Sequence, residues 1–416
     1  MKNKIYYGEY TLCHWIEMML NGDIELPEYQ RHFAWSEEDV ERLIQSLKEG
    51  QFVPPVTIAR HLEGKNAKNL ILDGQQRLTS LLLAYLGWFP NPKKNDDSEI
   101  FASEDDSESD EKKTLYKEIS WQYPKLFEYG KNKDEILSKL QEENNSQYKK
   151  LANRISKILN DEFLKNNYLG FNYIVPNCND EKEIRKNFSM SFRYINYYGK
   201  NLNPMESRMA LCFQNPEYAY YFEGKCVDGT DVLSMLRVMS ALKPVRIDFV
   251  RYLAILSQYV ASQNDAKKVM EGYSAYSKRE SYYADYVSYV IGLRQEYLDK
   301  KFLEFDFLKN FPNGCWKKRF ETVKDVIEKL TPVMHLNEQG AFLTLYEADV
   351  WLFGLLYYVL FEGKKLNGYL SEIKYEIERF IEKQEKDPVF KKNPNRIKYV
   401  RNRLEGSCEI YSHYVQ

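Results

Sequence analysis

The chain has few residues of the kinds that build metal centres and metal-dependent nucleases. Of its 416 residues, five are histidines and six are cysteines. No CxxC motif and no Cys/His pair has zinc-ligand spacing, so we expect the cysteines to be reduced structural thiols. There is no His-Asn-His motif and no pair of carboxylates followed by Glu-x-Lys in an apolar strand. These absences argue against DNA cleavage by this polypeptide alone.

Long apolar runs and an excess of one charge sign are also missing. The longest apolar stretch, residues 350–361, is shorter than the roughly 18 residues that a membrane span needs, and it predicts a buried core helix. The first eight residues lack the apolar block of a signal peptide, so we expect a cytoplasmic protein with no membrane partner. A net charge of −2 argues against wholesale nonspecific binding to duplex DNA, because such binding depends on neutralising phosphates.

A local basic surface stays open as an alternative. Candidates are residues 317–319, residues 391–392 and segment 396–403, which has basic residues at Arg396, Lys398, Arg401 and Arg403. We interpret it as a solvated helix near the C-terminus in preference to a nucleic-acid contact. Most of the 34 tyrosines lie in helical patterns such as residues 282–289, which predict amphipathic packing, with a minority available to a ligand.

The most informative stretch is residues 70–79, which read LILDGQQRLT. An apolar strand ends on Asp73, Gly74 makes a turn, and a helix with apolar periodicity follows. The N-terminus of a helix offers backbone N–H groups and a partial positive charge to a phosphate, and Arg77 adds a forked donor. Asp73 suits a metal ion, a ribose hydroxyl or the turn itself. The structural alternative is a well-capped turn without a ligand.

A second cluster, residues 26–35, reads LPEYQRHFAW and precedes a predicted helix that begins at Ser36 with a capping box. Pro54 and Pro55 then lead into a predicted short strand at residues 56–58. Two Gln-Arg pairs, at positions 30–31 and 76–77, therefore flank a helix–strand–strand unit.

These motifs, in this order, resemble a known family. PEYQR-x-F-x-W, PP-V-x-I and LILDGQQRLTSLL are followed by F-x-x-I-N-x-x-G-x-x-L-x-x-x-E at residues 192–206. Together they resemble the DGQQR domain of GmrSD-like, modification-dependent (Type IV) restriction systems, which is similar to the ParB and sulfiredoxin nucleotide-binding fold. The resemblance covers residues 8–225 well. The histidine-centred nuclease motif found in many relatives does not occur here.

The resemblance implies binding of a nucleoside triphosphate, with Mg²⁺, in restriction of foreign DNA. The implied nucleotide site consists of Gln30, Arg31, Asp73, Gly74, Gln75, Gln76, Arg77, Arg193 and Asn196. Asp73, Gln76 and Arg77 are the implied catalytic residues, and Asp73 is the candidate metal ligand. Modified or foreign DNA, a separately encoded nuclease subunit and further copies of this chain are the partners left open.

Three functions compete on these residues. The first is an NTP-hydrolysing defence protein, in which Arg31 and Arg77 hold the phosphates and Asp73 orients Mg²⁺ or water. The second is a nucleotide-gated module that binds DNA or a partner without significant turnover, because Glu28 and Asp73 are the only carboxylates in the two motifs. The third, a nuclease built on the ParB-like fold itself, is the least favoured.

For the architecture we expect an α+β protein, with a small ParB/sulfiredoxin-like mixed-sheet domain followed by a large, mainly helical region. Residues 1–90 form the predicted nucleotide-binding unit, and residues 91–113 form an acidic, flexible insertion with little to bury. Residues 114–230 are a helical continuation that carries the FxxIN motif, with residues 133–160 at helical spacing and a strand at 171–176. Residues 231–416 are predicted to be an all-helical C-terminal domain.

Overall fold

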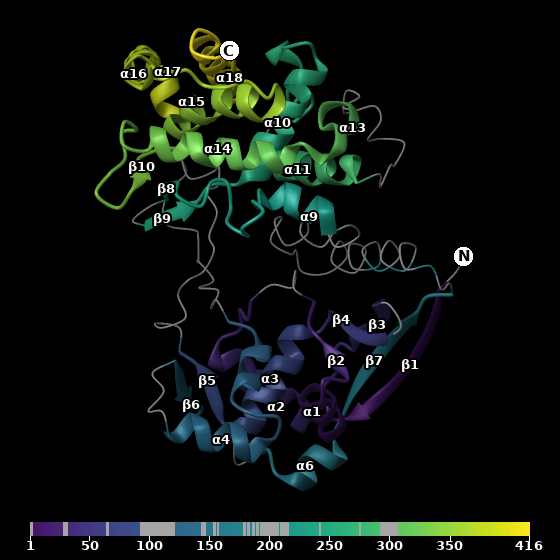
Figure 1. The fold of residues 1–416 in the computed structure, drawn as a ribbon. Helices are drawn as coiled ribbons and strands as arrows, with labels where there is room; N and C mark the ends of the chain where they lie inside the picture. The colour runs from purple at the N-terminus through teal and green to yellow at the C-terminus, as the bar shows by residue number, and fades with distance from the viewer. Residues whose placement is uncertain are drawn as a thin grey trace. The chain divides into compact units, whose positions relative to one another are not determined.

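The structure, a computed structural model, describes residues 3–27, 32–63, 66–91, 121–142, 147–152, 155, 158–177, 180, 184, 188, 191, 208, 216–240, 243–273, 276–291 and 307–416. The chain divides into two compact units (Figure 1). The first holds the described residues up to Arg208, and the second holds those from Pro216 onward. The predicted acidic insertion, from residue 92 on, and the FxxIN motif lie outside the described residues.

The first unit contains a mixed sheet and the helices that cover it. Its strands are β1 (Lys4–Thr11), β2 (Ile24–Glu25), β3 (Val56–Glu63), β4 (Asn66–Asp73), β5 (Trp88–Pro90), β6 (Tyr148–Lys150) and β7 (Tyr168–Val175). Its helices are α1 (Leu12–Asn21), α2 (Glu37–Lys48), α3 (Gln75–Leu86), η1 (Tyr123–Glu128), α4 (Lys133–Glu142) and α6 (Asp161–Asn166).

Five of these strands form one mixed sheet in the order β1-β7-β3-β4-β2. β3 and β4 form an antiparallel hairpin, while β7 pairs parallel with β3 and antiparallel with β1. Because β7 lies between β1 and β3, the sheet includes a strand from outside residues 1–90, the range predicted for this unit. A small mixed sheet followed by a mainly helical region confirms the predicted α+β class. The likeness to the ParB and sulfiredoxin fold stays a prediction.

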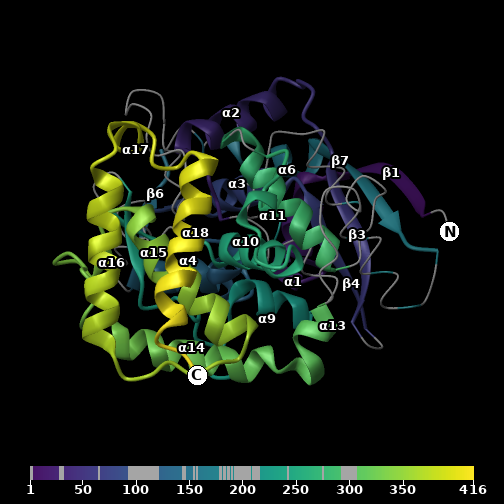
Figure 2. The ribbon, with the colours of Figure 1, turned by 90° about the horizontal axis from the view of Figure 1, so that it is seen from above.

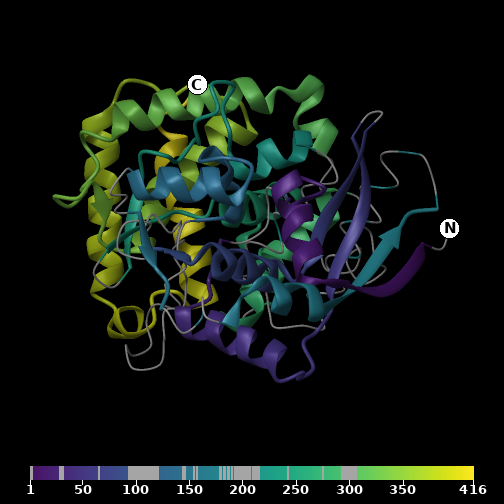
Figure 3. The ribbon, with the colours of Figure 1, turned by 90° about the horizontal axis from the view of Figure 1, so that it is seen from below.

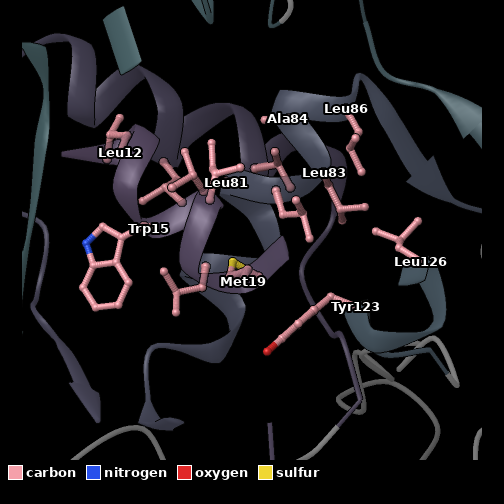
Figure 4. Packing of buried hydrophobic residues seen from close by; sticks show 14 of the residues in the cluster. Leu12, Trp15, Met19, Leu81, Leu83, Ala84, Leu86, Tyr123 and Leu126 are labelled. Carbon is pink, nitrogen blue, oxygen red and sulfur yellow. The ribbon is translucent and has the colours of Figure 1, made fainter. Parts of the chain in front are cut away.

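Capping residues fix where the first helices begin. Thr11 accepts a hydrogen bond from the His14 N–H and starts α1, and Ser36 with Asp39 forms the predicted capping box of α2. Behind these helices lies the core of the unit, in which Phe33 is fully buried. Figure 4 shows part of it, with Leu12, Trp15 and Met19 of α1, Leu81, Leu83, Ala84 and Leu86 of α3, and Tyr123 and Leu126 of η1.

The second unit is mainly helical. Its helices are α9 (Pro216–Glu223), α10 (Phe249–Ala261), η2 (Ala266–Lys268), α11 (Tyr276–Val290), α13 (Phe307–Asn310), η3 (Pro312–Gly314), α14 (Trp316–Leu330), α15 (Leu345–Leu355), the π-helical turn η4 (Leu356–Phe361), α16 (Leu370–Glu385), α17 (Pro388–Lys392) and α18 (Ile397–Ser412). Its strands are β8 (Arg237–Ser240), β9 (Lys243–Arg246) and β10 (Ala341–Phe342).

Helix α18 is central to this unit and packs on both α15 and α16, which Figure 2 shows side by side with it. Gly354 of α15 permits a close approach to α18, since a Cβ there would lie 2.4 Å from the Ser407 carbonyl oxygen. Ser407 accepts a hydrogen bond from the Gly354 N–H at 2.7 Å and donates one to the Val350 carbonyl at 2.6 Å. The predicted core helix at residues 350–361 is confirmed by the burial of α15 and η4.

A buried ion cluster joins α10, α15 and α18. The carboxylate of Asp349 accepts hydrogen bonds from Arg251, Arg403 and the Tyr252 hydroxyl, and all four side chains are almost fully buried. Burial by itself raises the pKa of Asp349, but the two guanidinium groups outweigh it and hold the pKa below its ordinary value. The interpretation of segment 396–403 as a solvated helix is therefore wrong for Arg403, whose charge lies inside the unit.

Two further expectations are corrected. Residues 133–160 are not helical throughout, because this range contains the strand β6, which pairs with β5. The C-terminal region is not all-helical, because β10, β8 and β9 form a three-stranded sheet. In both cases the strands are only two to four residues long, too short for their alternation to stand out from helical spacing. None of the described helices has the length and apolar character to cross a membrane.

Candidate nucleotide-binding site

The junction of β4 and α3 has the geometry that the sequence predicts. β4 ends at Asp73, Gly74 takes a left-handed conformation with φ of 93°, and α3 begins at Gln75. A Cβ at position 74 would lie 2.9 Å from Val56 Cγ2 and 3.2 Å from Val56 Cα, so the turn is pressed against the start of β3. Glycine is therefore required here both by conformation and by space.

Arg77 lies over this turn with most of its side chain buried. Its Nη2 donates to Asp73 Oδ2 at 2.8 Å and to the Pro55 carbonyl oxygen at 3.3 Å. Its Nε–H is buried and has no hydrogen-bond partner within the described part of the chain. The Arg77 side chain is 12% exposed, against 45% for Asp73. A cation with a spare donor thus lies beside the N-terminus of α3, and an anionic oxygen would satisfy that donor.

Gln76 has a different environment, which sequence reasoning did not predict. Its Oε1 accepts from the Ala34 N–H at 2.9 Å, and its Nε2 donates to the His32 carbonyl at 3.0 Å. Both ends of the amide therefore bond to backbone, which makes Gln76 a positioning residue for the segment after Gln30 and Arg31. Gln75 is buried beside it.

Polar side chains from two other strands adjoin the turn. Thr57 of β3 is paired in register with Asp73, and the Asn172 side chain of β7 donates to Thr57 Oγ1 at 3.3 Å. A β-bulge between Thr57 and Ile58 interrupts the ladder at this point. Bulges of this kind re-aim side chains and are common next to functional sites. Neither Thr57 nor Asn172 was predicted, because no local motif marks them.

The described residues give limited support for a preformed metal site at the junction. Asp73 does not belong to any group of three His, Cys, Asp or Glu ligands among them. The group that they do contain lies in the second unit, at Cys226, Asp228 and Glu321, where Lys324 Nζ is 2.7 Å from Asp228. Burial raises the pKa of Cys226 to about 11, so in the absence of a metal ion its thiol is protonated at neutral pH.

Four of the predicted nucleotide-site residues lie outside the described residues, namely Gln30, Arg31, Arg193 and Asn196. The five consecutive residues from Asp73 to Arg77 are described and lie together. Gln76 bonds to the backbone of His32 and Ala34, so the described residues that follow the first Gln-Arg motif in sequence lie beside the start of α3.

Comparison with known proteins gives a family match for the part of the chain that contains this junction, and a relative. Residues 13–213 match the family described as "GmrSD restriction endonuclease, N-terminal domain", which supports a GmrSD-like restriction-system domain in this part of the chain. An uncharacterized protein of Methanocaldococcus jannaschii is 34% identical over 107 residues, which is 20% of this chain and 18% of that protein. The chain thus covers under a fifth of that relative. No solved structure matches.

Proposed function

We propose that the first unit binds a nucleoside triphosphate where β4 meets α3 and hydrolyses it with Mg²⁺, as part of a GmrSD-like restriction system. The observation that carries the proposal is the Arg77 guanidinium at the N-terminus of α3. Its Nη2 bonds to Asp73 and Pro55, while its buried Nε–H has no partner among the described residues. The match of residues 13–213 to a restriction-endonuclease domain supports the biological role.

In this proposal each residue of the turn has a separate task. The backbone of Gly74 and the first turn of α3 approaches the phosphates closely, since no Cβ intervenes. Arg77 supplies positive charge from a site that is mostly shielded from water, where a cation stabilises developing phosphoryl charge most strongly. Gln76 holds the chain next to Arg31 in place, and Arg31 is the second proposed phosphate ligand.

The residues present fit a magnesium ion that arrives with the nucleotide. Mg²⁺ is commonly held by one or two carboxylates together with phosphate oxygens, and the half-exposed Asp73 is such a carboxylate. When bound, the ion would neutralise phosphate charge. DNA and a separately encoded nuclease subunit remain the proposed downstream partners.

A second candidate function, a nucleotide-gated binding module without turnover, is favoured by one observation. Asp73 already forms an ion pair with Arg77, so the carboxylate proposed to orient Mg²⁺ or water is partly engaged. In such a module the nucleotide would replace this ion pair and order the loop that Gln76 holds.

Phosphate release separates the two candidates. The purified full chain is incubated with Mg²⁺ and each common triphosphate, and inorganic phosphate is measured beside the Asp73→Asn variant. Release that Asp73→Asn abolishes, while triphosphate still binds, supports the hydrolase. Binding without release in the wild type favours the gated module, and absence of binding to every triphosphate contradicts both.

A further inference from the structure

Strand β1 has an unusual position in the first unit. Among the described strands it pairs with β7 alone, so it is an edge strand of the sheet, and it lies at the outer side of the sheet beside the N-terminus (Figures 1 and 3). Residues 4–9 are exposed on both faces of the strand. Ile5, Tyr6 and Tyr7 are among the large hydrophobic residues that remain exposed, with Tyr7 at 74% and Tyr6 at 51%.

The two tyrosines of β1 point to opposite faces, because side chains alternate along a strand. Tyr6 is paired with Tyr173 of β7, and Tyr173 is in register with Ile58 of β3, which belongs to the helix-covered core. Tyr7 is paired with Asn172 and therefore lies on the other face. Directly opposed side chains are about 5 Å apart at Cβ, so the register places Tyr6 and Tyr173 next to each other on this face.

Positive charge flanks these rings on the same face. Lys4 and Arg60 are both exposed, and each lies two residues from the aromatic row, Lys4 before Tyr6 and Arg60 after Ile58. The strand partners of Lys4 and Arg60 are Val175 and Asn69, which are both uncharged. The Tyr173 hydroxyl donates to Asn69 Oδ1 at 2.8 Å and so fixes its ring. Arg60 is close enough to Tyr173 to interact with it electrostatically.

We propose that Tyr6, Tyr173, Lys4 and Arg60 form a contact surface for single-stranded DNA, separate from the nucleotide site. The exposed Tyr6 ring offers a stacking surface to a base, and the half-buried Tyr173 side chain lies next to it on the same face. The cations beside them neutralise the DNA phosphates. The DNA must be single-stranded, because bases within a duplex are already stacked on one another. The choice of DNA as the partner rests on the proposed function in restriction, whereas the positions of the tyrosines and of the cations do not depend on that proposal.

Binding of a fluorescein-labelled oligothymidine to the full chain tests this proposal by anisotropy over a range of salt concentrations. Tyr6→Ala should weaken binding about tenfold, the usual scale for loss of one stacked base. Tyr7→Ala is the matched control, since it removes a more exposed tyrosine from the next position on the opposite face. The double change Lys4→Glu and Arg60→Glu should lower the salt slope by about 0.7 for each lost cation, whereas Lys139→Glu, on exposed α4 surface, should not.

Each outcome is decisive. If Tyr6→Ala and Tyr7→Ala lose the same affinity for the oligothymidine, the proposed surface is contradicted. Wild-type affinity and salt dependence in the Lys4→Glu and Arg60→Glu double variant would contradict it as well. Tighter binding of duplex DNA or of RNA of the same length contradicts the choice of partner. A dimer in light scattering that Tyr6→Ala dissociates would show that a second copy covers this face instead. Triphosphate binding is measured on the same variants and should be unchanged, so failure of this surface is distinguishable from failure of the nucleotide site.

Discussion

Arg77 donates to Asp73 across the turn that joins β4 to α3, with 2.8 Å between Nη2 and Oδ2. The two residues are one helical turn apart in sequence, yet they differ in exposure, because the arginine is mostly buried and the carboxylate is half exposed. The pair therefore presents a shielded cation and an accessible anion at one helix N-terminus. In the proposed function, Arg77 would hold a phosphate bound there, and Asp73 would be the carboxylate nearest to a metal ion that accompanies it.

Gln76 should matter for stability as well as for binding. Gln76→Ala removes two hydrogen bonds to the backbone of His32 and Ala34, and we expect a loss of about 1–3 kcal/mol in the free energy of unfolding. Gln51→Ala is the control, because Gln51 is exposed and its side chain bonds to the nearby side chains of Ser46 and Glu49. Urea titration of both variants measures the difference. Equal stability of the two would mean that Gln76 does not fix this segment.

Position 74 should tolerate a substitution to alanine less well than position 50, where the glycine also has a positive φ. Gly74→Ala and Gly50→Ala both place a Cβ on a residue with positive φ, but the space around Gly50 is open. The strain of a left-handed residue is common to both, on the order of 1 kcal/mol. We therefore expect Gly74→Ala to lower the melting temperature more, owing to its collision with Val56. A melting temperature for Gly74→Ala at or above that of Gly50→Ala contradicts the tight turn.

The buried cluster of the second unit should give stability that depends on pH. The pKa of Asp349 is depressed in the folded state, so its contribution is complete above its unfolded pKa, about 3.9, and is lost as the pH falls through the lower folded value. Asp349→Asn should cost about 3–5 kcal/mol at neutral pH, because Arg251 and Arg403 lose their buried counterion.

Measurement of the unfolding free energy from neutral pH down to about pH 3 checks whether the contribution of Asp349 falls with falling pH, since an unperturbed aspartate carboxyl titrates in this range. The difference in unfolding free energy between wild type and Asp349→Asn should become smaller as the solution becomes more acidic. Asp325→Asn, which alters an aspartate of α14 outside the cluster, controls for net charge. A gap that widens towards acidic pH would show that Asp349 is not held as a carboxylate.

Local signals in the sequence predicted the parts of the fold that depend on neighbouring residues. Ser36 with Asp39 marked the start of α2, and the apolar run ending at Asp73 marked β4, because caps and turns involve residues close together in the chain. The cluster from Asp73 to Arg77 could be found for the same reason.

Long-range partners could not be predicted in this way. Asn172 and Thr57 are 115 positions apart, and nothing local in either strand indicates that they meet. The catalytic role that the resemblance implies for Gln76 stays a prediction, and its two backbone bonds depend on a distant segment that no local pattern indicates. β1 was not predicted, because Ile5, Tyr6 and Tyr7 are consecutive apolar residues without the alternation of a half-buried strand.

Titration calorimetry of the full chain with nucleoside triphosphates and Mg²⁺ tests the central claim most directly, with Arg77→Ala beside Arg42→Ala. Arg42 is the matched control, because it also pairs with an aspartate of its own helix region but is 74% exposed. We predict that Arg77→Ala weakens binding by about 1.5–3 kcal/mol, the worth of a charged hydrogen bond, while Arg42→Ala binds as wild type does. Wild-type affinity of Arg77→Ala for every triphosphate that the chain binds would contradict the assignment of this site.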